Sequence, residues 1–510
     1  MKIRLLFFFI CLSTAVLWAM PPFADEAEPY PRRQRVKRPE QCSPLRRSPQ
    51  QFQSVGDKNI APRGLLILVE FQDVAFLPEN NREAFDSLAN AVNYTYDGAM
   101  GSTREYFRAQ SDGQYVPTFD VVGPIVLPYN MAYYGANDDS GLDINTGDFL
   151  MQAVDAADKL GVDFTRYDND RNGYIDFVYI IYAGYGEADT RIANTIWPHN
   201  WDLMSNLYYG CTQQNEYYYR SENDYKLPQY DGLFLNDYAC SACLRKDGMR
   251  SGIGTFSHEF GHVLGLPDYY PDNTKAGYMS VLPYTPGSWS IMGYGCYIND
   301  GRTPCNYSAF DKYYLGWLTP SIPQHGDTIT LPADNTTAYM ITKDGLIPPM
   351  GAETPDTVYY LENRQYDGWD TYLPGHGLLV WRVIYSDAAW RDNLPNNDTL
   401  IGYTLLTADH STPYNTSTMG GQHEGVPFPG RNDTMEAIST QLTLFDKYQL
   451  QDIQEQDGVI SFRFVDLNQA TPTENIEQLH YISPIKAIKN RQIVIYRNNR
   501  IYDLRGRVIQ

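Results

Sequence analysis

The order of apolar and polar residues divides the chain into a mixed part and a later part made of strands. Before residue 320, near-continuous apolar runs at 64–71 and 174–184 predict buried strands. Between 200 and 250 the sequence is polar and rich in Tyr and Asn, so we expect loops there. A further strand is expected at 115–127, and helices are expected at 102–111, 143–160 and 307–318, the last of them amphipathic.

Short alternating runs separated by Pro, Gly and Asn begin after Pro320, which is typical of strands joined by turns. DTITLPA, AYMIT, VYYLENR and GLLVWRVIY are such runs, and the stretch 410–430 is expected to be a long loop. The two patterns together predict an α+β protein. We expect a helix-and-strand domain at 61–320, a β-rich, sandwich-like domain at 321–470, and a C-terminal segment at 471–510.

Two segments precede the first domain. Residues 1–19 combine a short basic start, an apolar run and a small residue at Ala19, which predicts a secretory signal peptide. The alternative is a membrane anchor, but the apolar run is short for a spanning helix. Residues 20–60 are rich in Pro, Arg and Gln and contain too few apolar residues for a core. They are a disordered linker or a propeptide cut at a basic site such as Arg46, and we expect an exported protein without stable membrane insertion.

Charge and cysteine content narrow the class of protein. The net charge of −21 repels phosphate backbones, which excludes nucleic acid as an expected partner. One of the seven cysteines, Cys11, lies in the expected signal peptide. In an exported protein the five cysteines from Cys211 to Cys305 are expected to form disulfides. The plausible pairs are Cys296 with Cys305, and Cys211 with Cys240 or Cys243.

The part of the sequence that carries chemistry is FSHEFGHVLGLPDYY, from Phe256 to Tyr270. His258 and His262 are four residues apart, so a helix places both on one face, within reach of one metal ion. This H-E-x-x-H pattern favours zinc, and Glu259 is the expected general base and acid for a zinc-bound water. The pattern therefore predicts a metalloprotease site.

The third metal ligand is expected just after this helix. Gly265 tolerates the left-handed conformation that ends a helix, and Pro267 prevents the helix from continuing. Asp268 then returns to the metal, where a carboxylate oxygen completes the ligand set. Two alternatives remain: Asp268 is a loop carboxylate that only accepts backbone hydrogen bonds, or the third ligand is a distant glutamate, as in other zincins.

The extended motif H-E-x-x-H-x-x-G-x-x-D resembles that of the metzincins, with Asp268 in place of the usual third histidine. SIMGYG, at 290–295, resembles their Met-turn. The resemblance implies a zincin-type catalytic domain in which Met292 forms an apolar floor under the zinc ligands. It also implies that Tyr294 stabilises the developing oxyanion. The alternative for Met292 is an ordinary core methionine.

A closer resemblance is to the immune inhibitor A family of secreted bacterial metalloproteases. Segments of roughly residues 60–430 are similar to that family in order and spacing. These segments are GSTREYF, YDNDRNGYIDFVYIIYAGYGE, HEFGHVLGLPDYY, SWSIMGYG, SAFDKYYLGWL and YYLENRQYDGWDTYLPGHGLLVWRV. The resemblance implies a zinc endopeptidase that acts on proteins or peptides and is made as a zymogen.

A second cation site is expected in the loop before the strand at 174–184. Asp168, Asp170, Asn172 and Asp176 have the spacing of a calcium loop. A tyrosine replaces the glutamate that usually ends this pattern, and a strand follows, so the loop is not an EF-hand. The expected ion is Ca²⁺, and the alternative is an Asx-rich turn that feeds the strand.

Two hypotheses concern the ends of the chain. Cys42, in the prosegment, offers a soft anionic sulfur that binds zinc well and would cap the metal in a latent form. The last thirty residues, with RNNRIYDLRGRVIQ, resemble the C-terminal sorting domains of the bacterial type IX secretion route. That resemblance implies contact with secretion machinery and a secreted or cell-surface location. The alternative is a closing β-hairpin.

The function predicted from these patterns is that of a secreted zinc endopeptidase. The alternative from another class is a non-catalytic secreted binding protein on the same scaffold. That alternative requires a broken site, whereas no ligand is missing from the motif.

Overall fold

The computed structural model describes most of the chain between residues 62 and 469, together with several short strands outside that range. The described ranges are 62–138, 141–208, 227–270, 286–348, 357–396, 401–409, 425–431 and 437–469, and the strands at 18–19, 219–221, 224–225, 485–489, 492–497 and 500–502. Most of the expected signal peptide, the prosegment with Cys42, Cys211, and most of the expected loop at 410–430 lie outside the described residues.

A six-stranded sheet forms the framework of the N-terminal half, in the order β1-β5-β10-β4-β2-β3. The four strands β10, β4, β2 and β3 are parallel, and β5 and β1 extend the sheet in antiparallel pairing. Side chains of β2 alternate between two cores: Leu66 and Leu68 face one, and Leu65 and Ile67 face the other. The strand bounds are β1 Trp18–Ala19, β2 Arg63–Glu70, β3 Thr118–Val126, β4 Val178–Tyr185, β5 His199–Asp202 and β10 Asp237–Leu244.

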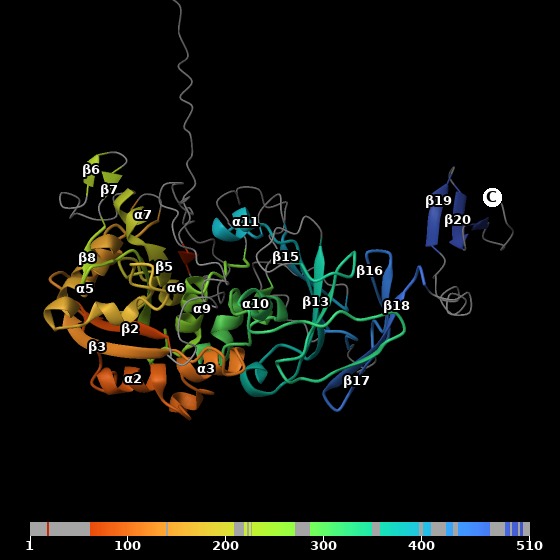
Figure 1. Cartoon of the computed structure of the whole chain (residues 1–510), viewed down its shortest axis with the longest axis horizontal. Helices are drawn as coiled ribbons and strands as arrows, with labels where there is room; N and C mark the ends of the chain where they lie inside the picture. Colours follow the sequence, from red (N-terminus) through yellow and green to blue (C-terminus); the bar gives the residue numbers. More distant parts are fainter. Residues whose placement is uncertain are drawn as a thin grey trace, which may run out of the picture.

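Helices cover both faces of this sheet, with α2 on one side and α5 on the other (Figure 1). Residues of α2, α3 and α9 belong to one core, and residues of α5 and α7 belong to the second. The helix bounds are α2 Arg82–Asn90, α3 Thr103–Gln110, α4 Met131–Gly135, α5 Thr146–Lys159, α6 Glu187–Thr190, α7 Leu203–Tyr208, α9 Gly254–Val263, α10 Ala309–Tyr314 and α11 Asp387–Arg391.

Shorter elements complete this half of the chain. Two small hairpins are formed by β6 Tyr219–Ser221 with β7 Asp224–Tyr225, and by β8 Gln229–Tyr230 with β9 Leu233–Phe234. Segments of 3-10 helix in this half are η2 Tyr96–Gly98, η3 Phe164–Tyr167, η5 Gly287–Trp289 and the kinked η6 Tyr294–Gly301, and η7 Gly368–Asp370 follows in the second half.

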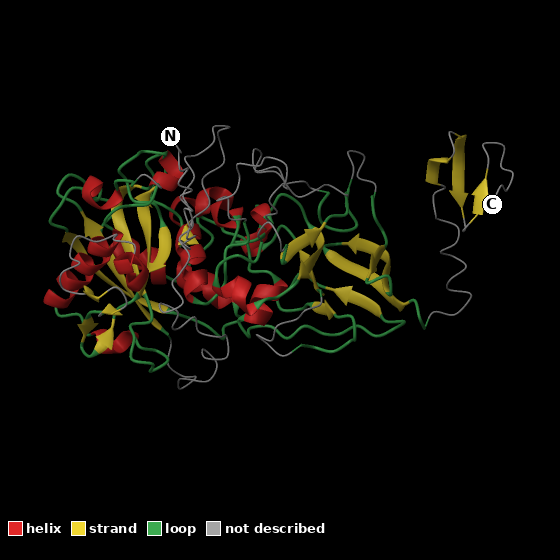
Figure 2. Cartoon of the chain, turned by 90° about the horizontal axis from the view of Figure 1, so that it is seen from above, coloured by secondary structure: helices red, strands yellow, loops and turns green. Residues whose placement is uncertain are grey.

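Antiparallel strands dominate after residue 320, as the alternating pattern predicts. They form two four-stranded sheets, β11-β18-β17-β16 and β12-β13-β14-β15, which share a core of their own (Figures 1 and 2). The strand bounds are β11 Thr328–Leu331, β12 Tyr339–Ile341, β13 Val358–Arg364, β14 Gly377–Val383, β15 Tyr403–Leu406, β16 Leu442–Leu444, β17 Tyr448–Gln456 and β18 Val459–Asp466. A separate three-stranded sheet contains β19 Ile485–Lys489, β20 Gln492–Arg497 and β21 Arg500–Tyr502.

One hydrophobic core continues from the first sheet into the second half of the chain. Phe260 of α9, Phe310 of α10 and Trp381 of β14 belong to the same buried cluster. Arg364 at the end of β13 donates to the carbonyl oxygen of Tyr307 at 2.9 Å and pairs with Asp370 at 3.1 Å. The β-rich part is therefore packed directly against the helices that follow the first sheet.

Two expectations about elements are wrong. The stretch 200–250, expected to be loops, contains the central strand β10. Its sequence DYACSACL consists largely of small residues, which suit a strand packed between two layers but lack the β-branched signature of a strand. Helix α10, expected to be amphipathic, is buried along its whole length because it lies between the two halves of the chain.

Among the described cysteines, the expected disulfide between Cys296 and Cys305 is not formed, because both are buried free thiols. Cys211, the expected partner of Cys240 or Cys243, lies outside the described residues. Cys240 and Cys243 lie on opposite faces of β10, one in each core. The Cys296 thiol is directed to the carbonyl oxygen of Gly293, at 3.3 Å, rather than to Cys305. The expected pairing of Cys296 with Cys305 is thus wrong.

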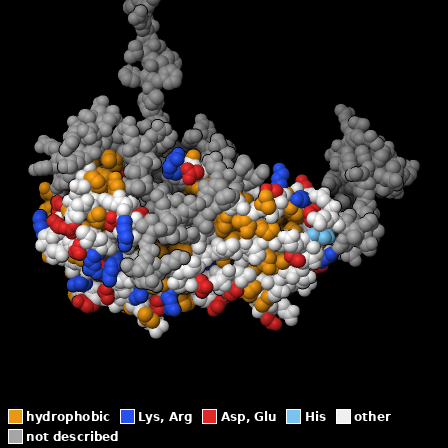
Figure 3. All heavy atoms as spheres, viewed as in Figure 1, with side chains coloured by type: hydrophobic (Ala, Val, Ile, Leu, Met, Phe, Trp, Pro, Cys, Tyr) orange, Lys and Arg blue, Asp and Glu red, His pale blue; other side chains and the backbone are white. Residues whose placement is uncertain are grey.

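Acidic and basic side chains are interspersed over the surface of the first sheet and its helices, on the face shown in Figure 3. Hydrophobic side chains gather on that face near β13 and β15. Within the described part of the chain, no helix has the length and apolar character needed to cross a bilayer.

Candidate metal centre

Helix α9 presents both motif histidines on one buried face. The ring planes of His258 and His262 are almost perpendicular, with centroids 4.8 Å apart. Nδ1 of His258 lies 2.7 Å from the carbonyl oxygen of Ile291, and Nδ1 of His262 lies 2.8 Å from that of Leu266. A carbonyl oxygen only accepts, so each Nδ1 carries the proton and each Nε2 presents a lone pair.

The turn after the helix brings Asp268 to these two lone pairs. Helix α9 ends at Val263, and Gly265 has a φ of +100°, the left-handed conformation that the sequence predicts there. Asp268 Oδ1 then lies 3.3 Å from Nε2 of His258 and 3.4 Å from Nε2 of His262. The three ligand atoms converge on one point, as a three-ligand zinc site requires.

Burial and charge set these groups in the forms that bind metal. Burial lowers the pKa of His262 to about 4, so its imidazole is neutral. Burial opposes ionisation of Asp268, but the neighbouring imidazoles lower its pKa below the usual range, so the carboxylate is charged. Nε2 of His258 and Oδ1 of Asp268 are buried and make no hydrogen bond with any described residue. Buried polar atoms normally have a partner, and a metal ion bound between these atoms would supply one.

The other oxygen of Asp268 is held by a residue that the sequence does not single out. Asn393, just after α11, donates from Nδ2 to Asp268 Oδ2 at 2.7 Å. Its Oδ1 accepts the backbone N–H of Asp268 at 2.6 Å. Asn396 donates to the carbonyl oxygen of the next residue, Tyr269, at 2.9 Å. No motif could have indicated this pairing, because the two asparagines belong to a loop 125 and 127 residues downstream of their partners.

The segment around Met292 is tied to the same centre. Ile291 accepts the hydrogen bond of His258, and the carbonyl oxygen of Met292 accepts the backbone N–H of Tyr269 at 2.9 Å. The Met292 side chain lies against α9, where a Cβ added at Gly261 would come within 2.6 Å of its sulfur. Met292 is fully buried directly under the helix turn that joins the two histidines.

Glu259 and Tyr294 are the two residues expected to take part in catalysis, and burial raises the pKa of each. Glu259 is fully buried, and neither of its carboxylate oxygens makes a hydrogen bond with a described residue. Burial, and then the charge of Asp268, raises its pKa well above the usual value. Tyr294 lies at the start of η6, two residues after Met292, and burial raises its pKa to about 12. No described contact joins the Tyr294 hydroxyl to the histidines or to Asp268.

The acidic loop at 168–176 forms a compact turn before β4. One carboxylate oxygen each from Asp168, Asp170 and Asp176 lies within 4.8 Å of the others. Asp168 also accepts the backbone N–H groups of Asn172 and Gly173, at 2.9 and 3.1 Å. Loop carboxylates that accept backbone N–H groups are typical of an Asx turn. The geometry of this loop is therefore compatible both with a calcium site and with an Asx-rich turn.

His199 is the first residue of β5, and both of its ring nitrogens contact protein groups. Its Nδ1 lies 2.6 Å from the carbonyl oxygen of Trp197, and its Nε2 lies 2.8 Å from the Tyr238 hydroxyl. With both ring nitrogens engaged by protein groups, His199 is not placed as a metal ligand.

Comparisons with known proteins identify the region that carries this centre. A family model described as "Immune inhibitor A peptidase M6, catalytic domain" matches residues 63–318. "Immune inhibitor A" of Bacillus thuringiensis subsp. alesti is 28% identical over 244 residues, which cover 43% of this chain and 32% of that protein. "Pre-pro-metalloprotease PrtV" of Vibrio cholerae serotype O1 (strain M66-2) is 27% identical over 246 residues, covering 43% of this chain and 24% of PrtV. The chain thus spans about a third and a quarter of the lengths of these relatives.

Proposed function

The chain belongs to the immune inhibitor A family of peptidases, and from this premise we propose a zinc-dependent endopeptidase that hydrolyses peptide bonds of proteins. The observation that carries this proposal is the convergence of His258, His262 and Asp268 on one point. Two imidazoles and one carboxylate are a ligand set that suits zinc and leaves a fourth position open. When bound, zinc supplies a Lewis acid that acidifies water and polarises the substrate carbonyl.

Glu259 supplies the proton transfers. Its position next to His258 on α9 supports this role, because the H-E-x-x-H pattern has its carboxylate beside the open metal position. Because burial raises its pKa, this group can take a proton from water and release it to the leaving amine. Gly265 and Met292 shape the centre, and Tyr294 is the proposed donor to the oxyanion.

The arrangement of the chain supports further proposals. We assign residues 61–320 to a zincin-type catalytic domain and 321–470 to a β-rich, sandwich-like domain. Residues 1–19 are the proposed signal peptide, and Cys42 is the proposed cap of the metal in a latent form. The segment 471–510 is the proposed sorting signal, and the mature protein is proposed to be secreted or held at the cell surface. Ca²⁺ is the proposed ion for Asp168, Asp170, Asn172 and Asp176.

The proposed function is tested with two variants of the full chain. Glu259→Ala is expected to abolish casein cleavage while it retains zinc, because Glu259 is not a ligand. Asp268→Ala is expected to lose both zinc and activity. Full zinc retention by Asp268→Ala favours a zincin with a distant glutamate ligand. Equal casein cleavage by wild type and Glu259→Ala contradicts the proposed mechanism, and no cleavage by a zinc-loaded wild type favours a binding protein.

A further inference from the structure

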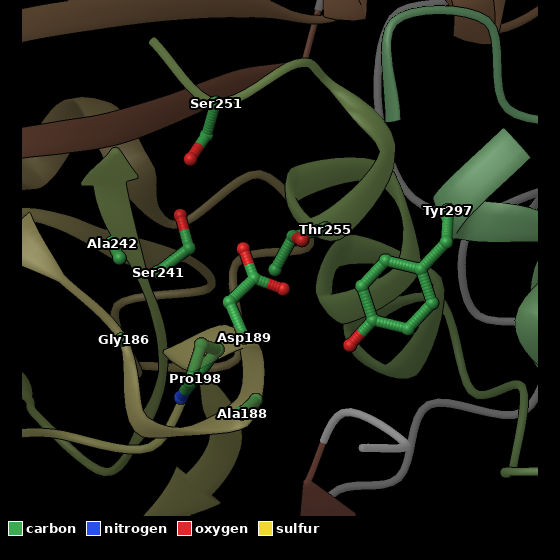
Figure 4. Close-up of a pocket in the computed structure, with 9 residues that line it drawn as sticks. All are labelled: Gly186, Ala188, Asp189, Pro198, Ser241, Ala242, Ser251, Thr255 and Tyr297. Carbon is green, nitrogen blue, oxygen red and sulfur yellow. The ribbon is translucent and has the colours of Figure 1, made fainter. Parts of the chain in front are cut away.

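A small cavity lies beside the first turn of α9. It has a volume of about 20 Å³, and its walls come from α6, the end of β10, α9 and η6. Asp189 lies in the middle of the close-up in Figure 4, with Ser241, Ser251 and Thr255 arranged around its carboxylate and the Tyr297 ring on the far side. The volume holds one group about the size of a water molecule.

The chemistry of the cavity is that of a cation site with one negative charge. Its polar lining consists of the Asp189 carboxylate and four hydroxyl groups, and none of the described lining residues is a lysine, arginine or histidine. Asp189 forms no hydrogen bond or ion pair with any residue in the described ranges. Burial raises the pKa of Asp189 to about 6, with smaller opposing effects of Lys246 and Arg245. At neutral pH the pocket therefore holds an ionised carboxylate without a cationic partner in its lining.

The cavity adjoins the metal centre. Thr255 lies on α9, three residues before His258. Tyr297 follows Met292 by five residues, and its pKa is raised by burial and, more weakly, by the charges of Cys296, Asp189, Tyr294 and Glu259. Thr255 and Tyr297 thus connect the cavity wall to the helix of His258 and to the segment that follows Met292. Pro198, on another wall, directly precedes β5, which pairs with β1 at one edge of the sheet.

We infer that this cavity receives the ammonium group of a substrate lysine next to the scissile bond, and that Asp189 determines this preference. The inference rests on the proposed peptidase function. An ammonium group is compact and has three N–H donors, which match a carboxylate flanked by hydroxyls. A planar guanidinium is larger than the cavity, and an acidic side chain is repelled by Asp189. The lysine stem would follow the apolar wall formed by Pro198 and Ala242.

The test compares matched peptides that differ only at the residue on either side of the scissile bond, with lysine, arginine, norleucine or glutamate there. With wild type we expect kcat/KM to be highest for lysine at one of the two positions. Asp189→Asn is expected to reduce the ratio of kcat/KM for lysine over norleucine about tenfold or more. Asp189→Glu, which keeps the charge, is expected to retain a preference for lysine.

Asp300→Asn is the matched control. Asp300 also acts on the pKa of Asp189 through its charge, but its side chain is half exposed and does not line the cavity. This variant is expected to keep the wild-type ratio. Zinc content and melting temperature of each variant, measured alongside, separate a change in preference from a loss of folding.

Cleavage by wild type without a lysine preference, or an unchanged ratio in a folded, zinc-loaded Asp189→Asn variant, would falsify the inference and leave the proposed function intact. An equal fall of the ratio in Asp300→Asn would also overturn it, because the effect would then come from the general field and not from the cavity. Absence of any cleavage by zinc-loaded wild type is a different result, since it contradicts the proposed function itself.

Discussion

Asn393 holds Asp268 by two hydrogen bonds, one to the backbone N–H at 2.6 Å and one to carboxylate Oδ2 at 2.7 Å. Both residues are fully buried, and the pair leaves Asp268 Oδ1 directed to the two histidines. Asn393 lies beyond residue 318, where the match to the peptidase catalytic domain ends. The orientation of Asp268, the proposed third ligand, therefore depends on a part of the chain outside that domain.

Asn393→Ala is expected to weaken zinc binding about 10–100-fold, which is the usual effect of removing a group that orients a metal ligand. The reason is that Asp268 loses the donor that fixes one of its carboxylate oxygens. Competition with a chromophoric chelator measures the zinc affinity directly, without reference to activity. Asn468→Ala, at an exposed position, is the control and is expected to bind zinc as wild type does. Unchanged affinity in a folded Asn393→Ala protein would show that the pair serves packing alone.

The lysine preference is expected to depend on pH through Asp189. Its pKa is raised to about 6, so the carboxylate is charged above that pH and neutral below it. The ratio of kcat/KM for lysine over norleucine is expected to be high at pH 7–8 and to fall as the pH drops through about 6. Tyr297 faces the carboxylate, while Lys246, Arg245, Asp247 and Asp300 act on its pKa from nearby segments.

This ratio is the appropriate measurement because both substrates share every other titrating step of the enzyme, and kcat/KM reports groups of the free enzyme. In Asp189→Asn the ratio is expected to be flat over the same range. A wild-type ratio that stays constant from pH 5 to 8 would remove Asp189 as the source of the preference.

Arg364 is expected to be a major source of stability where the two halves of the chain meet. It is buried, pairs with Glu362 at 3.0 Å and with Asp370 at 3.1 Å, and donates to the carbonyl oxygen of Tyr307. Arg364→Leu leaves two buried carboxylates without their cation. We expect it to lower the free energy of unfolding by about 3–5 kcal/mol, measured by urea denaturation. Arg391→Leu removes a half-exposed partner of Asp387 and is expected to cost at most about 1 kcal/mol. Equal costs for the two variants would contradict this assignment.

Features fixed by neighbouring residues were predictable from the sequence, whereas features made by distant residues were not. Ser102 caps α3 and forms a capping box with Glu105, as the local pattern indicates. The helix of the zinc motif and its turn at Gly265 follow from residues within one short stretch. The contact of Asn393 with Asp268 leaves no local trace, because it depends on how two distant loops pack.

The missed strand and the wrong disulfide have the same kind of cause. Small residues in β10 carry little intrinsic strand preference, and the strand forms because its neighbours on both sides are in place. The disulfide expectation came from the exported location, which says nothing of where a thiol points. The Cys296 thiol is directed to the carbonyl oxygen of Gly293, so its closeness to Cys305 in the sequence did not indicate its state.

Calcium is expected to stabilise the protein through the acidic loop before β4. Asp168, Asp170 and Asp176 place three carboxylate oxygens within 4.8 Å of one another, a separation that a hard cation can bridge. Calcium at about 100 times its dissociation constant is expected to add about 2.7 kcal/mol to the free energy of unfolding. The melting temperature, measured in a Glu259→Gln background to prevent self-cleavage, should rise with calcium and much less with magnesium.

The double variant Asp168→Asn/Asp170→Asn is expected to lose this calcium effect, because it removes two of the three charges. Asp158→Asn, at an exposed position on α5, is the control and should keep it. The Asx-turn interpretation predicts the opposite pattern. In an Asx turn the amide oxygens still accept the backbone N–H groups of Asn172 and Gly173, so the variant would remain stable. Calcium would then leave the melting temperature of every variant unchanged.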